Sequence, residues 1–336
     1  MRMKEIIARL IERKDLSRQE ARSAMSAIMS GEATPAQIAG FLVGLRIKGE
    51  TVDEITGCAE EMCARAVKVK APAGAIDTCG TGGDGLRTFN ISTAAAIVAA
   101  GAGVPVAKHG NRGVSSPCGS ADVLEKLGVK IDAPVDAVER CLAEAGFGFM
   151  FAPLMHQAMK HAVGPRRELG VRTVFNVLGP LTNPAGAKRQ LMGVFSGGFV
   201  RPLAEVLRNL GSSRALLVHG EDRLDEVSPC GRTFFALLQE DGSISEGALT
   251  PEDAGLERVR DGLSVNSAEE SAAMIRMVLE GKNISARTAV ALNAGAALWA
   301  AGKAKDLREG SKMASVALDS GAALKVLEKV IHLTNG

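Results

Sequence analysis

The chain has 336 residues, 46 % of them hydrophobic and 23 % charged, with 38 Gly, one Trp and no Tyr. This length and composition are typical of a globular chain of about two domains, and they exclude disordered, collagen-like and coiled-coil chains. Basic and acidic residues nearly balance, 40 against 38, and aromatic residues are few, so neither charge nor stacking groups indicate nucleic acid or a membrane as a partner.

The first 70 residues are predicted to form four short helices. Ser17, Thr34 and Thr51 each stand three positions before a Glu or Gln, which is the capping-box pattern of a helix start. Apolar residues recur at helical spacing behind these starts, and no strand pattern interrupts them. The stretch 69–74, Val-Lys-Ala-Pro-Ala-Gly, is typical of a linker, so we expect a helical domain over residues 1–72.

From residue 75 onward, short strands alternate with helices. Helices are expected between most strands, for example over 93–100 and 203–210, and the chain returns to helices over 288–301, 306–317 and 322–332. The alternation favours a mainly parallel sheet flanked by helices, in a large α/β domain over residues 73–336 that helices near 165–185 join to the helical domain. The predicted strands are 75–78, 104–107, 129–131, 147–151, 190–194 and 215–218, with a further, antiparallel strand over 232–238.

A glycine loop, residues 80–85, follows the first predicted strand and precedes a helix. It reads Gly-Thr-Gly-Gly-Asp-Gly, and its backbone N–H groups and the helix N-terminus could close on an anion. Asn90, Ser92 and Thr93 are expected to cap that helix. The glycines also fit the GxGxxG pattern, but Asp84 would repel a bare pyrophosphate, and Lys108 and His109 stand where a dinucleotide fold needs an acid. A nicotinamide-dependent dehydrogenase is therefore disfavoured.

A second loop, residues 108–120, should lie beside the glycine loop, because neighbouring parallel strands end at the same edge of a sheet. Lys108 suits a phosphate as a point charge, and a helix is expected to begin near Ser120. His109 is the one histidine in a reactive position, and both a structural and a catalytic role stay open for it.

Two further segments carry charged groups that could bind a metal ion or a substrate. Asp225 and Glu226 follow the strand predicted over 215–218, and adjacent carboxylates can share Mg²⁺ ions that also hold a pyrophosphate. The basic stretch 156–170 contains Arg166 and Arg167, either of which could bind a substrate carboxylate through two hydrogen bonds.

The cysteines and the apolar runs indicate the cytoplasm. The six cysteines form no CxxC pair, which favours small hydrophobic residues in a reducing compartment over zinc ligands. The N-terminus shows no signal-peptide core, and the longest nearly apolar run, 94–107, is too short to cross a bilayer. We expect a cytoplasmic protein without a membrane partner.

Five motifs occur in order along the chain: Gly-Thr-Gly-Gly-Asp at 80–84, Asn-Ile-Ser-Thr at 90–93, Lys-His-Gly-Asn-Arg at 108–112, Asn-Val-Leu-Gly-Pro-Leu-Thr-Asn-Pro at 176–184 and Asp-Glu at 225–226. Together they resemble the anthranilate phosphoribosyltransferases of tryptophan biosynthesis, over essentially the whole chain. The resemblance implies a nucleoside-phosphorylase-like phosphoribosyltransferase fold. It also implies a reaction in which phosphoribosyl pyrophosphate and anthranilate give N-(5-phosphoribosyl)anthranilate and pyrophosphate. Mg²⁺, with two ions expected, and a homodimer joined through the helical domain are implied as well.

The resemblance also assigns site residues. Asn111, Arg166 and Gly80 match anthranilate-binding positions, and Ser92, Asp225 and Glu226 match Mg²⁺ positions. The arylamine is neutral at pH 7, so positioning and leaving-group stabilisation should dominate, and no catalytic residue is expected beyond the open case of His109. The residues that match positions binding phosphoribosyl pyrophosphate are Gly80, Gly83, Asp84, Thr88, Asn90, Ile91, Ser92, Thr93, Lys108, Ser116 and Ser120.

Two other functions remain as alternatives. A pyrimidine nucleoside phosphorylase of the same fold would need neither the acidic pair nor Arg166. A nucleic-acid-binding relative is disfavoured by the net charge of +2 and the few aromatic residues.

Overall fold

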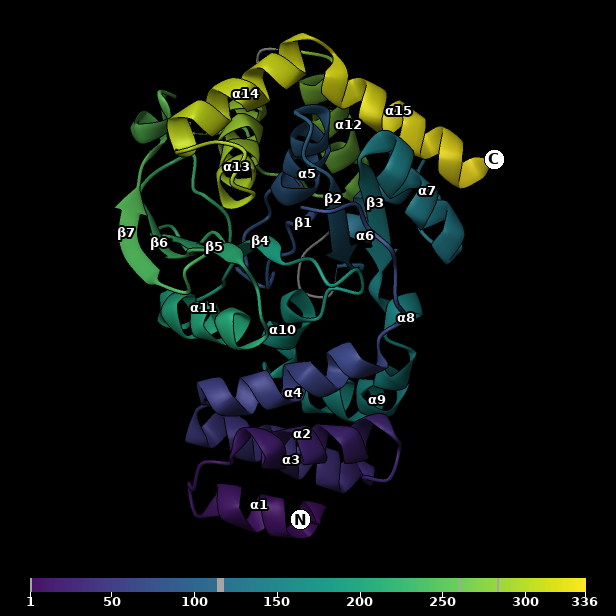
Figure 1. Cartoon of the computed structure of the whole chain (residues 1–336), viewed down its shortest axis with the longest axis vertical. Coiled ribbons are helices and arrows are strands. Elements are labelled where there is room, and N and C mark those ends of the chain that lie inside the picture. Colours follow the sequence, from purple (N-terminus) through teal and green to yellow (C-terminus); the bar gives the residue numbers. More distant parts are fainter. Residues whose placement is uncertain (1, 114–117, 260, 283) are drawn as a thin grey trace.

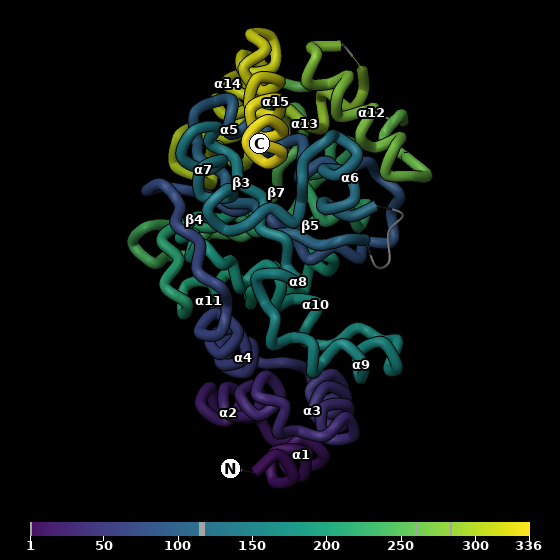
Figure 2. The backbone as a smooth tube through the Cα atoms, turned by 90° about the vertical axis from the view of Figure 1, so that its right-hand side faces the viewer, coloured from purple at the N-terminus to yellow at the C-terminus, as the bar shows by residue number. Residues whose placement is uncertain are grey.

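The computed structural model of the chain describes residues 2–113, 118–259, 261–282 and 284–336. A small helical part contains the N-terminus, and a larger part is built on one sheet (Figure 1). The view turned by 90° shows the same order, with the N-terminus at the end of the helical part and the C-terminus in the larger part (Figure 2).

The N-terminal part consists of α1 (Met3–Ile11), α2 (Arg18–Met29), α3 (Pro35–Lys48) and α4 (Val52–Arg65), which confirms the four predicted helices. Each predicted capping box is present, with Ser17, Thr34 and Thr51 accepting a hydrogen bond from the backbone N–H three positions on. These helices bury apolar residues at helical spacing around a common core.

Residues from the middle of the chain complete that core. α9 (Lys160–Leu169) packs on α2 and α3, and α10 (Phe175–Leu178) follows it. Ala162, Val174 and Phe175 belong to the same buried hydrophobic cluster as the N-terminal helices. Figures 1 and 2 show α9 below α8 (Ala152–Met155), at the level of the N-terminal helices.

The larger part contains a seven-stranded sheet in the order β3-β2-β1-β4-β5-β6-β7. The first five strands in this order are parallel, and β6 and β7 are antiparallel. The mainly parallel sheet and the extra antiparallel strand near 232–238 are thus confirmed. The strands are β1 (Ile76–Asp77), β2 (Val106–Gly110), β3 (Phe147–Phe151), β4 (Arg189–Gly193), β5 (Arg214–Gly220), β6 (Thr233–Leu238) and β7 (Ile244–Leu249).

Two sequence predictions for the sheet were wrong. Residues 129–131 form no strand, because Val129 and Ile131 reach the core from the turn that ends α6 (Ser120–Lys126), where the Val129 N–H donates to the Leu124 carbonyl. The edge strand β7 was not predicted, since its inner four residues are exposed and show no apolar alternation.

Helices cover both faces of the sheet. On β5, Leu216 and Val218 face one buried cluster, while Ala215 and Leu217 face the cluster shared with the N-terminal helices. The first face carries α5 (Ile91–Gly101), α12 (Ala268–Leu279), α13 (Ser285–Ala300), α14 (Leu307–Asp319) and α15 (Ala322–Asn335); the second carries α11 (Val200–Asn209) (Figure 1). α7 (Val135–Ala145) packs beside β3, and the remaining short helices are α8 (Ala152–Met155), η1 (Gln157–Met159), η2 (Gly179–Leu181), η3 (Gly197–Phe199) and η4 (Pro251–Ala254).

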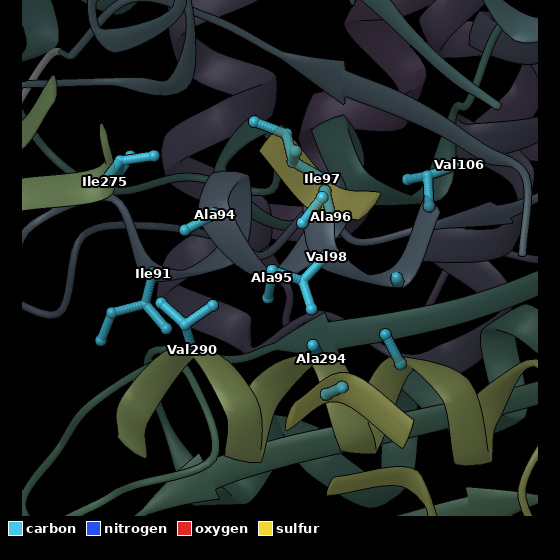
Figure 3. Close-up of a cluster of buried hydrophobic side chains, with 14 of the residues drawn as sticks. Ile91, Ala94, Ala95, Ala96, Ile97, Val98, Val106, Ile275, Val290 and Ala294 are labelled. Atoms are coloured by element: carbon cyan, nitrogen blue, oxygen red, sulfur yellow. The ribbon is translucent and has the colours of Figure 1, made fainter. Parts of the chain in front are cut away.

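α5 and α13 pack closely because alanines dominate their contact. Figure 3 shows Val290 and Ala294 of α13 directed toward α5, whose labelled side chains include Ala94, Ala95 and Ala96. In the described part of the chain, no helix is long and apolar enough to cross a membrane.

Candidate active site

The order in which successive strands are added to the sheet reverses between β1 and β4. Along the chain, β1 leads outward to β2 and β3, whereas β4 leads the other way to β5. Loops that leave two such strands diverge, and the crevice between them is the usual ligand site of an open α/β sheet. The glycine loop follows β1, the second loop follows β2, and the acidic pair follows β5, so topology brings the three motifs to one edge.

The glycine loop lies directly against the segments that follow β4 and β5. The Thr81 N–H donates to the Gly193 carbonyl at 2.9 Å, and the Gly82 N–H donates to Asp225 Oδ2 at 2.6 Å. A Cβ on Gly80 would lie 3.1 Å from both Gly193 O and Asp225 Oδ2, so Gly80 permits the close approach. Gly82 and Gly83, with φ of 64° and 79°, are needed instead for their backbone conformation.

The start of α5 differs from its prediction in one respect. Asn90 is the N-cap residue, but its side chain does not cap the helix: Oδ1 accepts from the Thr93 hydroxyl at 2.6 Å, and Nδ2 donates to the Cys118 carbonyl at 3.3 Å. A helix N-terminus without a side-chain cap suits an anionic ligand. Ile91 and Thr93 are buried beneath this end, and the Ile91 N–H donates to the Phe89 carbonyl.

A neighbouring segment braces the approach to α5. Thr88 forms an antiparallel bridge with Ser264, and the Asn90 N–H donates to the buried Ser271 hydroxyl of α12 at 3.0 Å. Thr88 and Asn90 are therefore held in place by two residues, Ser264 and Ser271, that are distant from them in the sequence.

Lys108 lies on the floor of the site and is almost completely buried. Its Nζ donates to the Thr78 carbonyl at 3.2 Å, the Thr78 hydroxyl at 3.3 Å and Ser92 Oγ at 3.4 Å. The ammonium thus sits between the end of β1 and the start of α5, where its charge partly opposes the effect of burial on the pKa of Glu226.

Three carboxylates come together opposite Lys108. Burial raises the pKa of Glu226 to about 7, although Lys108 and hydrogen bonds with Ser92 oppose this effect. Burial, together with repulsion from Glu226 and Asp84, raises the pKa of Asp225 well above its ordinary value, and burial also raises the pKa of Asp84. Buried acids that repel one another are stabilised as anions by a cation.

This donor set fits Mg²⁺. Among the described residues, no group of three or more His, Cys, Asp or Glu is placed to hold a metal ion by itself. Mg²⁺ characteristically takes one or two protein carboxylates and completes its shell with water and substrate phosphate oxygens, which Asp225, Glu226 and the Ser92 hydroxyl would allow.

The second loop is closed by an acid of α6. Asp122 Oδ2 accepts from the backbone N–H groups of Gly113 at 2.8 Å and Gly119 at 2.9 Å. Arg112 turns away to pair with Asp122 and Glu125. The Asn111 carbonyl accepts from Ser120 Oγ at 3.4 Å, which joins two predicted site residues. Ser116, a further predicted residue, lies outside the described residues.

The structure brings His109 and His156 together, with 5.0 Å between their ring centroids. Burial lowers the pKa of His109 to about 3 and that of His156 to about 4, so both rings are neutral at pH 7. His109 Nδ1 lies 3.2 Å from the Gly179 carbonyl, which fixes the proton on Nδ1, and Nε2 is buried with no hydrogen-bond partner among the described residues. No sequence pattern indicated this neighbour, because His156 follows a different strand.

Arg166 and Arg167 differ in how far they are buried. Arg167 is exposed, whereas Arg166 is partly buried with its guanidinium 4.8 Å from the Phe175 ring centroid. Burial alone lowers the pKa of Arg166, and no acidic side chain in the described chain opposes that effect. No hydrogen bond joins Arg166 to Asn111 or Gly80 within the described residues.

Sequence reasoning missed several residues that hold the loops. Asp77, at the end of β1, is buried and accepts from the N–H groups of Cys79 at 3.0 Å and His109 at 3.2 Å, while Asn183 Nδ2 donates to its second oxygen at 2.7 Å. Burial raises the pKa of Asp77 to about 6. The signal available was an acid at the end of an otherwise apolar strand. Arg172, which follows α9, donates to the Gly83 carbonyl and lies over the Phe195 ring.

Comparison with known proteins agrees with this architecture. The helical bundle domain of a glycosyl transferase family matches residues 4–66, and the a/b domain of a glycosyl transferase family matches residues 73–324. The fold is thus a small N-terminal helical domain and a larger α/β domain with a mostly parallel sheet, as predicted, and the chain belongs to this class of glycosyl transferases.

Individual relatives show which family of glycosyl transferases the chain belongs to. The chain is 53 % identical to the anthranilate phosphoribosyltransferase of Nitrobacter hamburgensis, over 99 % of each chain. It is similar to the crystal structure of anthranilate phosphoribosyltransferase from Thermus thermophilus, with a TM-score of 0.92, 44 % identity and coverage of 98 % and 99 %. The Saccharomyces cerevisiae enzyme in complex with phosphoribosyl pyrophosphate and Mg matches with a TM-score of 0.91, 28 % identity and coverage of 99 % and 98 %. The chain belongs to the anthranilate phosphoribosyltransferase family.

Proposed function

We propose that this protein transfers the phosphoribosyl group of phosphoribosyl pyrophosphate to the amino group of anthranilate and releases pyrophosphate. The observation that carries the proposal is the meeting of the glycine loop, Lys108 and the pair Asp225–Glu226 at the point where the strand order reverses. This arrangement can neutralise a pyrophosphate leaving group, and family membership supplies the acceptor.

The donor is bound by the loop after β1 and the start of α5. Backbone N–H groups of the glycine loop and the uncapped end of α5 suit its phosphates, and Lys108 adds a buried positive charge. Asp84, whose side chain interacts with that of Asp225, would meet sugar hydroxyls or the cation. The residues proposed to bind phosphoribosyl pyrophosphate are Gly80, Gly83, Asp84, Thr88, Asn90, Ile91, Ser92, Thr93, Lys108, Ser116 and Ser120.

Ser92, Asp225 and Glu226 would hold Mg²⁺, with two ions proposed. When bound, Mg²⁺ neutralises charge on the pyrophosphate oxygens and so improves the leaving group. The repulsion among the buried acids supports a cation at this place. The chain's own contribution is to orient these carboxylates.

The chemical step needs little help from an acid or base. The bond between the anomeric carbon and the pyrophosphate oxygen breaks, the neutral arylamine nitrogen forms the new bond, and the extra proton on that nitrogen then passes to solvent water. His109 is neutral, with the lone pair of Nε2 unused among the described residues, so it can accept a hydrogen bond but carries no proton to donate from that nitrogen. Positioning is therefore the main catalytic contribution.

Arg166, Asn111 and Gly80 are proposed to bind anthranilate. Arg166 offers a guanidinium with no acidic partner among the described residues, which leaves its fork of donors available for a carboxylate. The same feature disfavours the pyrimidine nucleoside phosphorylase alternative, because that reaction involves no acceptor carboxylate and no acidic pair.

We also propose a homodimer joined through the helical domain. Ile11, Ile47, Val163 and Val171 are more than half exposed, at 75 %, 66 %, 53 % and 58 %. α3 buries one apolar face in its own domain and still presents Ile47 outward, beside Val171, in a shallow depression. A second copy would cover this apolar face. Light scattering should give about twice the 34.9 kDa of one chain, and Ile47→Glu should give the monomer.

We also propose the limits of the two domains and a cytoplasmic location. Residues 1–72, with the helices near 165–185, form the helical domain, and 73–336 form the α/β domain. The packing of α9 on α2 and α3 supports placing this middle segment with the helical domain. The buried cluster of these helices continues to Ala215 and Leu217 of β5, where the two domains meet. The six cysteines, none of which forms a disulfide within the described chain, suit the cytoplasm.

Anthranilate fluorescence provides the test. Purified protein with Mg²⁺ and phosphoribosyl pyrophosphate should consume anthranilate, which is followed as loss of that fluorescence. No turnover under these conditions, with phosphorolysis of thymidine or uridine instead, would overturn the proposal. A complex with anthranilate would show whether Arg166 and Asn111 contact its carboxylate.

A further inference from the structure

Val227, the residue directly after the acidic pair, has both of its backbone polar groups bound by one side chain. Its N–H donates to Asn293 Oδ1 at 2.9 Å, and its carbonyl accepts from Asn293 Nδ2 at 2.9 Å. Asn293 belongs to α13, 66 residues further along the chain, and its side chain is fully buried. The amide thus pairs with Val227 as a neighbouring strand would.

The same amide is anchored to its own helix. Nδ2 also donates to the Ala289 carbonyl one turn earlier, at 3.0 Å. α13 itself is held against α5 by Val290 and Ala294, which flank Asn293 in sequence (Figure 3). Asn293 therefore transmits the position of the rigid α5–α13 pair to the backbone of Val227.

Asp225 is also held by a close backbone contact. The backbone of Gly193, at the end of β4, packs so closely on the Asp225 carbonyl that a Cβ there would overlap it. Between Gly193 and Asn293, the short segment 225–227 has little freedom. The carboxylates of Asp225 and Glu226 depend on that backbone for their direction.

We propose that Asn293 is a positioning residue that orients the Asp225–Glu226 pair toward the cation and pyrophosphate. The proposal rests on the proposed function, since it takes the acidic pair as the metal-binding end of that site. Only a side chain with one acceptor and one donor at amide spacing can satisfy both groups of Val227. Without it, two buried backbone groups lose their partners, and the segment must shift to recover them.

Asn293→Leu and Asn293→Ala separate this role from general packing. Leucine has a similar volume and no polar atom, whereas alanine leaves room in which water can replace the amide. Residues that orient metal ligands without touching the metal typically change metal affinity by about 10–100-fold. We expect the apparent Mg²⁺ activation constant to rise about tenfold or more in Asn293→Leu and less in Asn293→Ala.

The matched control is Leu292→Ala. Leu292 is the adjacent residue of α13 and is equally buried, but it makes no contact with the acidic segment through a polar group. This substitution should lower the melting temperature at least as much as the Asn293 variants do. It should leave the Mg²⁺ constant within about twofold, and all variants should keep the anthranilate KM within about threefold.

Binding is measured independently of turnover. Titration calorimetry with Mg²⁺ and inorganic pyrophosphate should show weaker binding in Asn293→Leu than in Leu292→Ala, at a temperature where circular dichroism shows both folded. If Asn293→Leu does not fold, Asn293→Ala carries the comparison. Unchanged Mg²⁺ pyrophosphate binding in a folded Asn293 variant, or an equal loss in Leu292→Ala, overturns the proposal. Absence of anthranilate turnover in the unsubstituted protein would instead overturn the proposed function, because the pyrophosphate titration does not depend on that acceptor.

Discussion

Gly193→Ala should damage the site while leaving the fold intact. Gly193 ends β4, accepts a hydrogen bond from Thr81 of the glycine loop, and packs on the backbone of Asp225. A Cβ at this position would overlap the Asp225 carbonyl, so one of the two backbones must move by more than about 1 Å. Because the neighbouring atoms are backbone rather than a flexible side chain, the displacement passes directly to the acidic pair.

The magnitude follows from that displacement. Misplacing reacting groups by about 1 Å can cost about 10²-fold in rate, which corresponds to about 2.7 kcal/mol of transition-state stabilisation. Overpacking of this kind typically costs about 1–3 kcal/mol of stability as well. We therefore expect kcat/KM to fall about 100-fold, with a melting temperature lower by only a few degrees.

The assay is the initial rate of anthranilate consumption at saturating Mg²⁺, alongside thermal unfolding. Gly198→Ala is the matched control, since a Cβ there would meet only Ser196 Oγ at 4.0 Å. It should retain the unsubstituted rate to within about twofold. A Gly193→Ala variant with kcat/KM within threefold of the unsubstituted protein would show that the close approach of β4 to Asp225 has no role in activity.

Three further predictions address the remaining groups. Arg166→Ala should raise the anthranilate KM about tenfold or more and the phosphoribosyl pyrophosphate KM little, whereas Arg167→Ala should change neither; a selective loss of donor binding would contradict the assignment. Asp225→Asn combined with Glu226→Gln should weaken the Mg²⁺ dependence of the rate, measured by metal titration, and an unchanged dependence would remove both residues from the site. The lowered pKa of His109, about 3 against an ordinary 6.5, keeps the ring neutral from about pH 5 to 8, so its NMR resonances should not titrate in that range; a midpoint near 6.5 would refute this.

Local patterns in the sequence predicted much of the fold because they report on single elements. β3 was predicted with its observed bounds, since its five residues form a short apolar run after a helix. The capping boxes of Ser17, Thr34 and Thr51 were equally local. β1 proved shorter than predicted, at Ile76–Asp77, because the chain beyond it turns at once into the glycine loop. β7 escaped prediction, since an exposed edge strand shows no apolar alternation.

For the site, the sequence could predict which loops meet but not what holds them. Parallel topology is enough to place the glycine loop, the second loop and the acidic pair at one edge. The partners that fix these loops come from distant parts of the chain: Asn183 for Asp77, Asn293 for Val227 and His156 for His109. Nothing in local composition marks such a pair. The expected cap by Asn90 failed because its Oδ1, the atom that would cap the helix, accepts from the Thr93 hydroxyl, while its Nδ2 donates to the distant Cys118 carbonyl.

The positions of the glycines show what this chemistry requires of the fold. Gly82, Gly83 and Gly85 take positive φ, so they shape the loop itself. Gly80 and Gly193 have ordinary φ and are required because backbone approaches backbone there. A reaction with a good leaving group and a neutral nucleophile gains little from a strong acid or base, and much from donors held at fixed places before the substrate arrives. Close contacts between backbones supply that rigidity more reliably than long side chains could, because glycine contacts leave no rotamer to adjust. Part of the high glycine content of this chain therefore follows from a reaction that depends on hydrogen-bond donors held in fixed positions by close backbone contacts.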